Sequence, residues 1–159
     1  MLLYHGSNVI VRRPRLLPKA RALDFGAGFY LTSDYEQAAK WAGLTAKRRR
    51  SGKPYVSVYR VDDVAYSKLH VMRYEKPDAD WLRYISANRK NEFAGDDWDV
   101  VAGPVANDNT MPVLNLYMKG AYTEEEAIRR LLPQKLKDQY AFKTERSLAC
   151  FVFQEVIEP

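Results

Sequence analysis

The chain has 159 residues, a formal net charge of +5 at neutral pH and 47% hydrophobic residues, among them 11 tyrosines. This length predicts a single domain over residues 1–159 with an aromatic-rich core, and the charged fraction of 28% argues against wholesale disorder. A disulfide framework and a cysteine-rich zinc site are excluded because Cys150 is the single cysteine, and its apolar surroundings predict a buried thiol.

The first half of the chain predicts short strands around one amphipathic helix. Three segments have the pattern of strands: 2–5, 29–32 and 55–61. Ser33 and Glu36 have the spacing of a capping box, with Ser33 as the N-cap. Ala38, Trp41 and Ala42 then recur at helical spacing, so we expect a helix that begins after Ser33 and ends before residues 51–54.

The second half adds further strands and two longer helices. The expected strands are 70–74, 98–105, 139–143 and 151–157. The expected helices are 77–90 and 123–132, with a short turn or helix at 145–149. Asp96, Asp97 and Asp99 lack the spacing of a metal-binding loop and predict a solvated turn. The fold class is therefore α+β, with more strands than helices.

Two N-terminal motifs carry the first indication of chemistry, Tyr4-His5-Gly6-Ser7 and Gly26-Ala27-Gly28-Phe29-Tyr30-Leu31-Thr32. Each reads as a strand beside a polar or glycine-bearing turn. On adjacent strands they would place an imidazole, a phenol and a bare glycine backbone along one cleft. This set suits a flat, cationic ligand that carries an amide, such as the nicotinamide end of NAD⁺.

The order and spacing of four segments resemble the ADP-ribosyltransferase superfamily, specifically its diphtheria-toxin and poly(ADP-ribose) polymerase branch. The segments are His5-Gly6, Gly28-Phe29-Tyr30, Trp41 eleven residues beyond Tyr30, and Gln139-Tyr140-Ala141-Phe142. Residues 21–32, 101–105 and 139–145 also look like a bacterial family of unknown function within that superfamily. The resemblance spans nearly the whole chain and implies split antiparallel sheets with a few peripheral helices.

The resemblance also implies roles for individual residues. The implied catalytic residues are His5, Tyr30 and Gln139. The implied NAD⁺-binding residues are His5, Gly6, Ser7, Arg21, Tyr30 and Trp41, and no metal is implied. His5 and Ser7 would contact ribose, the backbone of Gly6 would bind the carboxamide, and Tyr30 and Trp41 would sandwich the pyridinium ring.

Basic residues near these motifs have two interpretations. Arg12, Arg13, Arg15, Lys19 and Arg21 could contact the diphosphate of NAD⁺, because guanidinium matches phosphate geometry, or could form a solvated loop. Asp24 could orient this loop over the adenine side or be an ordinary turn residue. The run at 47–50 could complement the helix dipole or bind an acidic partner.

The third position departs from the family pattern. The polymerase branch has a glutamate where this chain has Gln139, and an amide supplies only a dipole to a cationic ribose. Loss of such a contact costs about 3 kcal/mol in other enzymes. Chain elongation is therefore not expected, whereas transfer of a single ADP-ribose remains open. Glu145 could substitute for the missing carboxylate or could belong to a capped turn after Thr144.

The sequence thus predicts an NAD⁺-dependent mono-ADP-ribosyltransferase of the bacterial toxin type, either an effector or the toxin of a toxin–antitoxin pair. A protein is favoured over a nucleic acid as the macromolecular acceptor, and an antitoxin or immunity protein is a possible partner. The expected compartment is the cytoplasm, since no signal or membrane span is recognisable, although a domain cut from a longer secreted chain would look the same. An NAD⁺ glycohydrolase, a non-catalytic NAD⁺ or ADP-ribose binding module and, on net charge alone, a nucleic-acid-binding domain are the alternatives.

Overall fold

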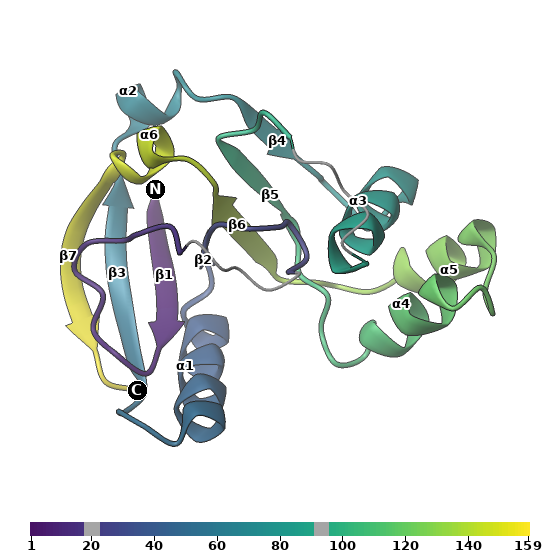
Figure 1. Cartoon of the computed structure of the whole chain (residues 1–159), viewed down its shortest axis with the longest axis horizontal. Helices are drawn as coiled ribbons and strands as arrows, with labels where there is room; N and C mark the ends of the chain where they lie inside the picture. The colour runs from purple at the N-terminus through teal and green to yellow at the C-terminus, as the bar shows by residue number, and fades with distance from the viewer. Residues whose placement is uncertain (18–22, 91–95) are drawn as a thin grey trace.

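A computed structural model describes residues 1–17, 23–90 and 96–159, and Figure 1 shows their arrangement. The strands are β1 Leu2–Ser7, β2 Phe29–Leu31, β3 Tyr55–Val61, β4 Val71–Arg73, β5 Val100–Pro104, β6 Asp138–Phe142 and β7 Phe151–Ile157. The helices are α1 Tyr35–Arg49, α2 Asp63–Tyr66, α3 Ala79–Arg89, α4 Met111–Met118, α5 Glu124–Leu131 and α6 Glu145–Leu148. The predicted α+β class is confirmed.

The strands form two sheets that lie side by side in Figure 1. One sheet has the order β1-β3-β7 and the other β2-β6-β5-β4. A single bridge between Tyr4 and Thr32 joins β1 to the end of β2. All strand pairs are antiparallel except β4 with β5, which run parallel. The expectation of purely antiparallel sheets is therefore wrong at this edge, because α3 crosses over between β4 and β5 and returns the chain in the same direction.

Helix α1 begins one residue later than its capping-box pattern predicts. The N-cap is Asp34, whose carboxylate accepts a hydrogen bond from the backbone N–H of Gln37 at 2.8 Å. Ser33 is not the cap because its N–H and hydroxyl both donate to the carboxylate of Asp138. The side chain that the pattern assigned to the helix thus ties the end of β2 to the start of β6.

Three hydrophobic clusters hold the sheets and helices together, and the smallest packs Ala38 and Ala42 of α1 against Val56 and Val58 of β3. One lies between the two sheets and includes Leu3, Phe29, Tyr59 and Phe142. Another packs α3, α4 and α5 against the second sheet, where they cover its outer side in Figure 1. Trp81 of α3 is fully buried there and donates its indole N–H to the carbonyl of Pro104 at 2.9 Å. Burial of these aliphatic and aromatic side chains is the main favourable contribution to the stability of the fold.

The acidic turn before β5 is only partly solvated, contrary to expectation. Asp97 is exposed, but the carboxylate of Asp96 forms an ion pair with Lys143 at 2.6 Å, and both side chains are nearly buried. Asp99 is buried and accepts hydrogen bonds from the N–H of His70 and the hydroxyl of Thr144. Buried carboxylates persist only with such partners, and none of these partners is adjacent in sequence.

Cys150 is 2% exposed, which confirms the predicted buried thiol, and burial raises its pKa. No helix in the described ranges is long and apolar enough to cross a membrane.

Candidate functional site

A pocket of about 1260 Å³ opens between β1, β2, the segment after β1 and the C-terminal half of α1. Among its lining residues are six that the sequence singles out: His5, Gly6, Ser7, Tyr30, Trp41 and Gln139. They come from β1, β2, α1 and β6, so the fold brings together side chains that are far apart in the chain. Arg21, the remaining predicted binding residue, lies outside the described residues.

His5 is held by its neighbours in one defined state. Its Nδ1–H donates to the backbone carbonyl of Tyr30 at 2.7 Å, and its ring stacks on Phe29 with 4.2 Å between centroids. Burial lowers the pKa of His5 to about 4, the hydrogen bond to Tyr30 opposes this shift, and Arg49 adds to it. The imidazole is therefore neutral at pH 7, and Nε2 is a hydrogen-bond acceptor.

Gly6 is required by packing as well as by its place in the pocket. A Cβ at this position would lie 2.0 Å from the carbonyl oxygen of Ala38, so only glycine lets α1 approach β1 so closely.

The backbone N–H and C=O of Gly6 are a second feature of the pocket. Tyr4 exchanges hydrogen bonds with Thr32, on the edge of β1 that faces away from β3, and by strand alternation the N–H and C=O of Gly6 face this same edge. Within the described residues no backbone group pairs with them there, so both are available to a ligand.

The hydroxyl of Tyr30 is fully engaged within the protein. It donates to the carbonyl of Gly26 at 2.6 Å and accepts from the N–H of Phe25 at 3.0 Å, which closes the turn before β2. Burial raises the pKa of the Tyr30 phenol well above its ordinary value. Proton transfer by this hydroxyl is therefore not expected, and the ring face is what Tyr30 offers to a ligand in the pocket.

Trp41 and Ser7 complete the predicted set. Trp41 lines the pocket from α1 and is half-buried, so aromatic surface reaches the pocket from both β2 and α1. Ser7 is 8% exposed, and its hydroxyl accepts a weak hydrogen bond from the N–H of Val9. The close packing of Gly6 on α1 sets the depth at which Trp41 lies.

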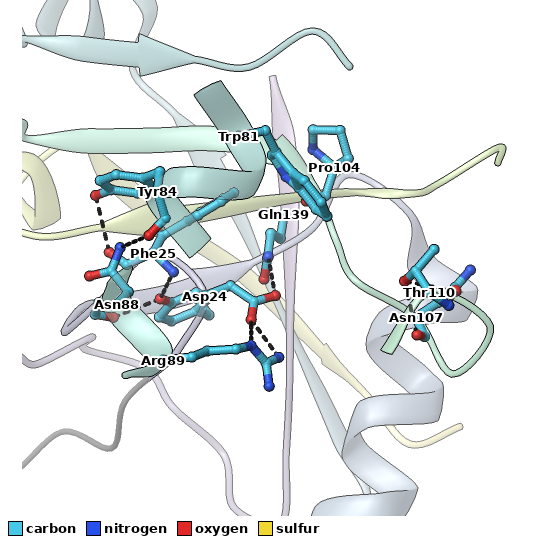
Figure 2. Close-up of polar contacts among 12 residues, drawn as sticks. Asp24, Phe25, Trp81, Tyr84, Asn88, Arg89, Pro104, Asn107, Thr110 and Gln139 are labelled. Atoms are coloured by element: carbon cyan, nitrogen blue, oxygen red, sulfur yellow. Dashed lines mark hydrogen bonds and ion pairs between the residues drawn. The ribbon is translucent and has the colours of Figure 1, made fainter. Parts of the chain in front are cut away.

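Gln139 lies in a buried polar chain that sequence reasoning missed, shown in Figure 2. Its Nε2 donates to one carboxylate oxygen of Asp24 at 3.1 Å. The other oxygen of Asp24 accepts from Nε and Nη2 of Arg89, both at 2.5 Å. All three residues line the pocket. Local spacing could not reveal this chain, because the three residues come from the turn before β2, from α3 and from β6.

Glu145 does not take the place of the missing glutamate in this arrangement. It is exposed at the start of α6 and lies outside the pocket lining. Thr144 caps α6 by accepting from the N–H of Ser147, as the alternative reading of a capped turn predicts. The carboxylate beside Gln139 is that of Asp24.

Arginine dominates the charge around the pocket. Its lining includes six arginines, from the segment after β1, from the last turn of α1 and from the end of α3: Arg12, Arg13, Arg15, Arg48, Arg49 and Arg89. Arg12 lies over the ring of Phe153 and Arg49 donates to Asn8. Such a cluster gives the pocket a positive potential that attracts phosphate. Lys19, also predicted to contact phosphate, lies outside the described ranges.

A metal centre finds no support in the described part of the chain, where no cluster of three or more histidine, cysteine, aspartate or glutamate side chains could hold an ion. The pocket thus combines arginines, aromatic rings, a neutral imidazole and an unpaired backbone edge. This composition fits an organic ligand that carries phosphate and a flat ring.

Comparison with known proteins gives one match. No curated protein and no solved structure matches the chain. A family model described as "Protein of unknown function (DUF3990)" matches residues 1–153, nearly the whole length. The chain therefore belongs to the DUF3990 family, whose function is unknown.

Proposed function

We propose that the protein is an NAD⁺-dependent mono-ADP-ribosyltransferase. The observation that carries the proposal is the joint presence of His5, Tyr30, Trp41 and Gln139 in one arginine-lined pocket. The pocket volume of about 1260 Å³ is ample for a dinucleotide, since typical ligand pockets measure about 300–1,000 Å³.

Each part of the pocket has a matching part of NAD⁺. The arginines suit the diphosphate, and the free N–H and C=O of Gly6 suit the carboxamide of nicotinamide. Nε2 of neutral His5 can accept from a ribose hydroxyl. The rings of Tyr30 and Trp41 supply flat surfaces for the pyridinium, each worth about 1 kcal/mol.

The proposed reaction replaces one bond at C1′ of the nicotinamide ribose. The C–N glycosidic bond breaks, nicotinamide leaves with the electron pair, and a nucleophile of the acceptor bonds to C1′ and loses its proton. The transition state carries positive charge on the ribose, so nearby acceptor oxygens stabilise it. In this pocket Gln139 supplies such an oxygen, which is weaker than the carboxylate of the polymerase branch.

The test uses NAD⁺ labelled on its adenylate part, incubated with the protein and a bacterial lysate. We expect label on macromolecules and release of nicotinamide. His5→Ala should abolish both, because it removes the acceptor at Nε2. The matched control is His70→Ala, since His70 is exposed and outside the pocket. Absence of both NAD⁺ binding by calorimetry and label transfer would overturn the proposal.

A second function, binding of NAD⁺ or ADP-ribose without turnover, is favoured by Gln139 alone. It predicts tight binding in calorimetry with no nicotinamide release, and binding unchanged in Gln139→Glu. Release of nicotinamide with free ADP-ribose and no labelled macromolecule would instead indicate a glycohydrolase that uses water as acceptor. The three outcomes are distinct in one set of assays.

The toxin role is tested in growing bacteria. Expression of the wild-type chain should arrest growth and deplete or redirect NAD⁺, whereas expression of His5→Ala should not. Normal growth at equal expression of both chains would argue against a toxin while leaving the enzymatic assay to decide the activity.

A further inference from the structure

Asp24 is a buried carboxylate in the wall of the pocket. Asp24 is 6% exposed, and both of its carboxylate oxygens accept hydrogen bonds from side chains that also line the pocket. One oxygen accepts from Arg89 and the other from Nε2 of Gln139. The guanidinium of Arg89 has only hydrogen-bond donors, so it can bind the carboxylate in any orientation. The amide of Gln139 has an acceptor oxygen and a donor NH₂ group, so its orientation matters.

The contact with Asp24 decides which end of that amide meets the ligand. If the amide rotated, Oε1 would face a carboxylate oxygen and two acceptors would repel each other. Nε2 is therefore held toward Asp24, and Oε1 is the remaining acceptor. Among the described residues Oε1 has no hydrogen-bond partner, and it is not one of their buried unpaired polar atoms. It is therefore accessible, and Gln139 opens onto the pocket.

We propose that Asp24 is a positioning residue of the NAD⁺ site, which fixes Gln139 with Oε1 toward the ligand and polarises its amide. The inference rests on the proposed function. An amide whose N–H donates to a carboxylate carries more negative charge on its oxygen, because linked hydrogen bonds polarise one another. Gln139 and Asp24 together then do what one glutamate does in the polymerase branch. The negative charge is on Asp24, which does not contact the ligand but is hydrogen-bonded to Gln139, which does.

The diagnostic variant is Asp24→Asn. The oxygen of the new amide must stay with Arg89, which offers only donors, so its NH₂ group faces Gln139. Gln139 then rotates to accept with Oε1 and presents Nε2, a donor, to the ligand. We expect kcat for nicotinamide release to fall about 10²-fold, with a much smaller change in KM.

Rescue separates this role from a structural one. In Asp24→Asn/Gln139→Glu, the NH₂ of residue 24 donates to the new carboxylate, which offers its second oxygen to the ligand. We expect kcat to return to the wild-type value or above it. Gln139→Glu alone should not raise kcat, because it sets two carboxylates side by side. The two substitutions are thus expected to be strongly non-additive.

The matched control is Asp96→Asn, which alters another nearly buried, ion-paired carboxylate outside the pocket. Its melting temperature should fall, as in Asp24→Asn, but its kcat should match the wild type. Equal kcat in wild type and Asp24→Asn, or no rescue by the double variant when its melting temperature equals that of Asp24→Asn, would overturn the role of Asp24 alone. A wild-type chain that neither binds nor consumes NAD⁺ would overturn the proposed function and this inference with it.

Discussion

Two ion pairs with nearly buried carboxylates lie at opposite ends of β6 and differ in what surrounds them. At one end Asp24 pairs with Arg89 beside Gln139, and at the other Asp96 pairs with Lys143, the residue after the strand. The carboxylate side chains are equally hidden, each 7% exposed. Their cationic partners are not, since Arg89 is 30% exposed and Lys143 only 12%.

The remaining partners explain the difference. Asp96 also accepts from the hydroxyl of Tyr84 and from the N–H of Trp98, and Lys143 donates to the hydroxyl of Tyr84. None of these four residues lines the pocket, so this group is closed off from it. Asp24 instead shares its second oxygen with Gln139, and all three members of its group line the pocket. Burial of charge alone therefore does not mark a functional site. A buried charge whose partners open onto a cavity is the stronger indication.

The largest expected effect is on stability at the closed pair. Lys143→Met should lower the free energy of unfolding by about 3–5 kcal/mol, because it leaves Asp96 buried without its counter-charge. Arg89→Met should cost clearly less, since Arg89 is 30% exposed and water is close enough to solvate Asp24 once the guanidinium is lost. Urea unfolding of both variants measures this difference. Equal losses would show that the two pairs are equally closed.

For the pocket region, the buried state of His5 can be tested by the pH dependence of stability. Its pKa is about 4 in the folded protein and 6.5 in the unfolded chain, so the unfolded chain binds more protons between these values. Stability should therefore fall as the pH is lowered from 6.5 to about 4, by up to about 3 kcal/mol.

His5→Asn keeps a donor for the carbonyl of Tyr30 but cannot titrate, so this part of the pH dependence should disappear. His70→Asn, at the exposed histidine, should retain it. Unfolding curves at a series of pH values distinguish the two. An unchanged slope in His5→Asn would contradict the buried neutral imidazole.

Packing beside the pocket is tested by two glycines of the same region. Gly6→Ala should cost about 1–3 kcal/mol, because its Cβ would collide with the carbonyl of Ala38, and α1 would have to move with Trp41. Gly43→Ala meets nothing within 4 Å and should stabilise α1 by up to about 1 kcal/mol. Thermal unfolding provides the measurement, and a neutral Gly6→Ala would refute the close approach.

The smallest expected effect concerns the exposed arginines that line the pocket. Arg13→Glu should weaken NAD⁺ binding by up to about fivefold at low salt, and the difference should shrink as salt is added. Arg60→Glu is the control, since Arg60 is also exposed and changes the net charge equally but lies outside the pocket. Calorimetric titration at two salt concentrations compares them. Equal weakening by both would mean that net charge, not the pocket, attracts the ligand.

Local patterns predicted much of the fold. Strands were predicted at 55–61, from its alternation, and at 151–157, and both have the observed bounds. Helix α4 was not predicted because its sequence, with Asn115 as the one polar residue, has no polar face to give it a helical periodicity, and its N-cap, Thr110, makes no side-chain capping bond. The N-cap of α1 was misplaced because Asp138, distant in sequence, captures Ser33.

The candidate site divides in the same way. His5, Gly6, Tyr30, Trp41 and Gln139 were predicted as one cleft from motifs and family spacing, and they do line one pocket. The links of Asp24 to Gln139 and to Arg89 were not predicted. These contacts depend on how β6 and α3 dock, which no local periodicity encodes.

The place of β6 has a consequence for the order in which the protein becomes competent during synthesis. β6 is the sixth strand along the chain, yet it lies between β2 and β5 and provides the sheet partner of the three-residue β2. A nascent chain that stops before β6 therefore has neither a paired β2 nor Gln139. Long-range pairing of this kind forms late, so we expect the pocket to be assembled only after Phe142, the last residue of β6, has emerged from the ribosome.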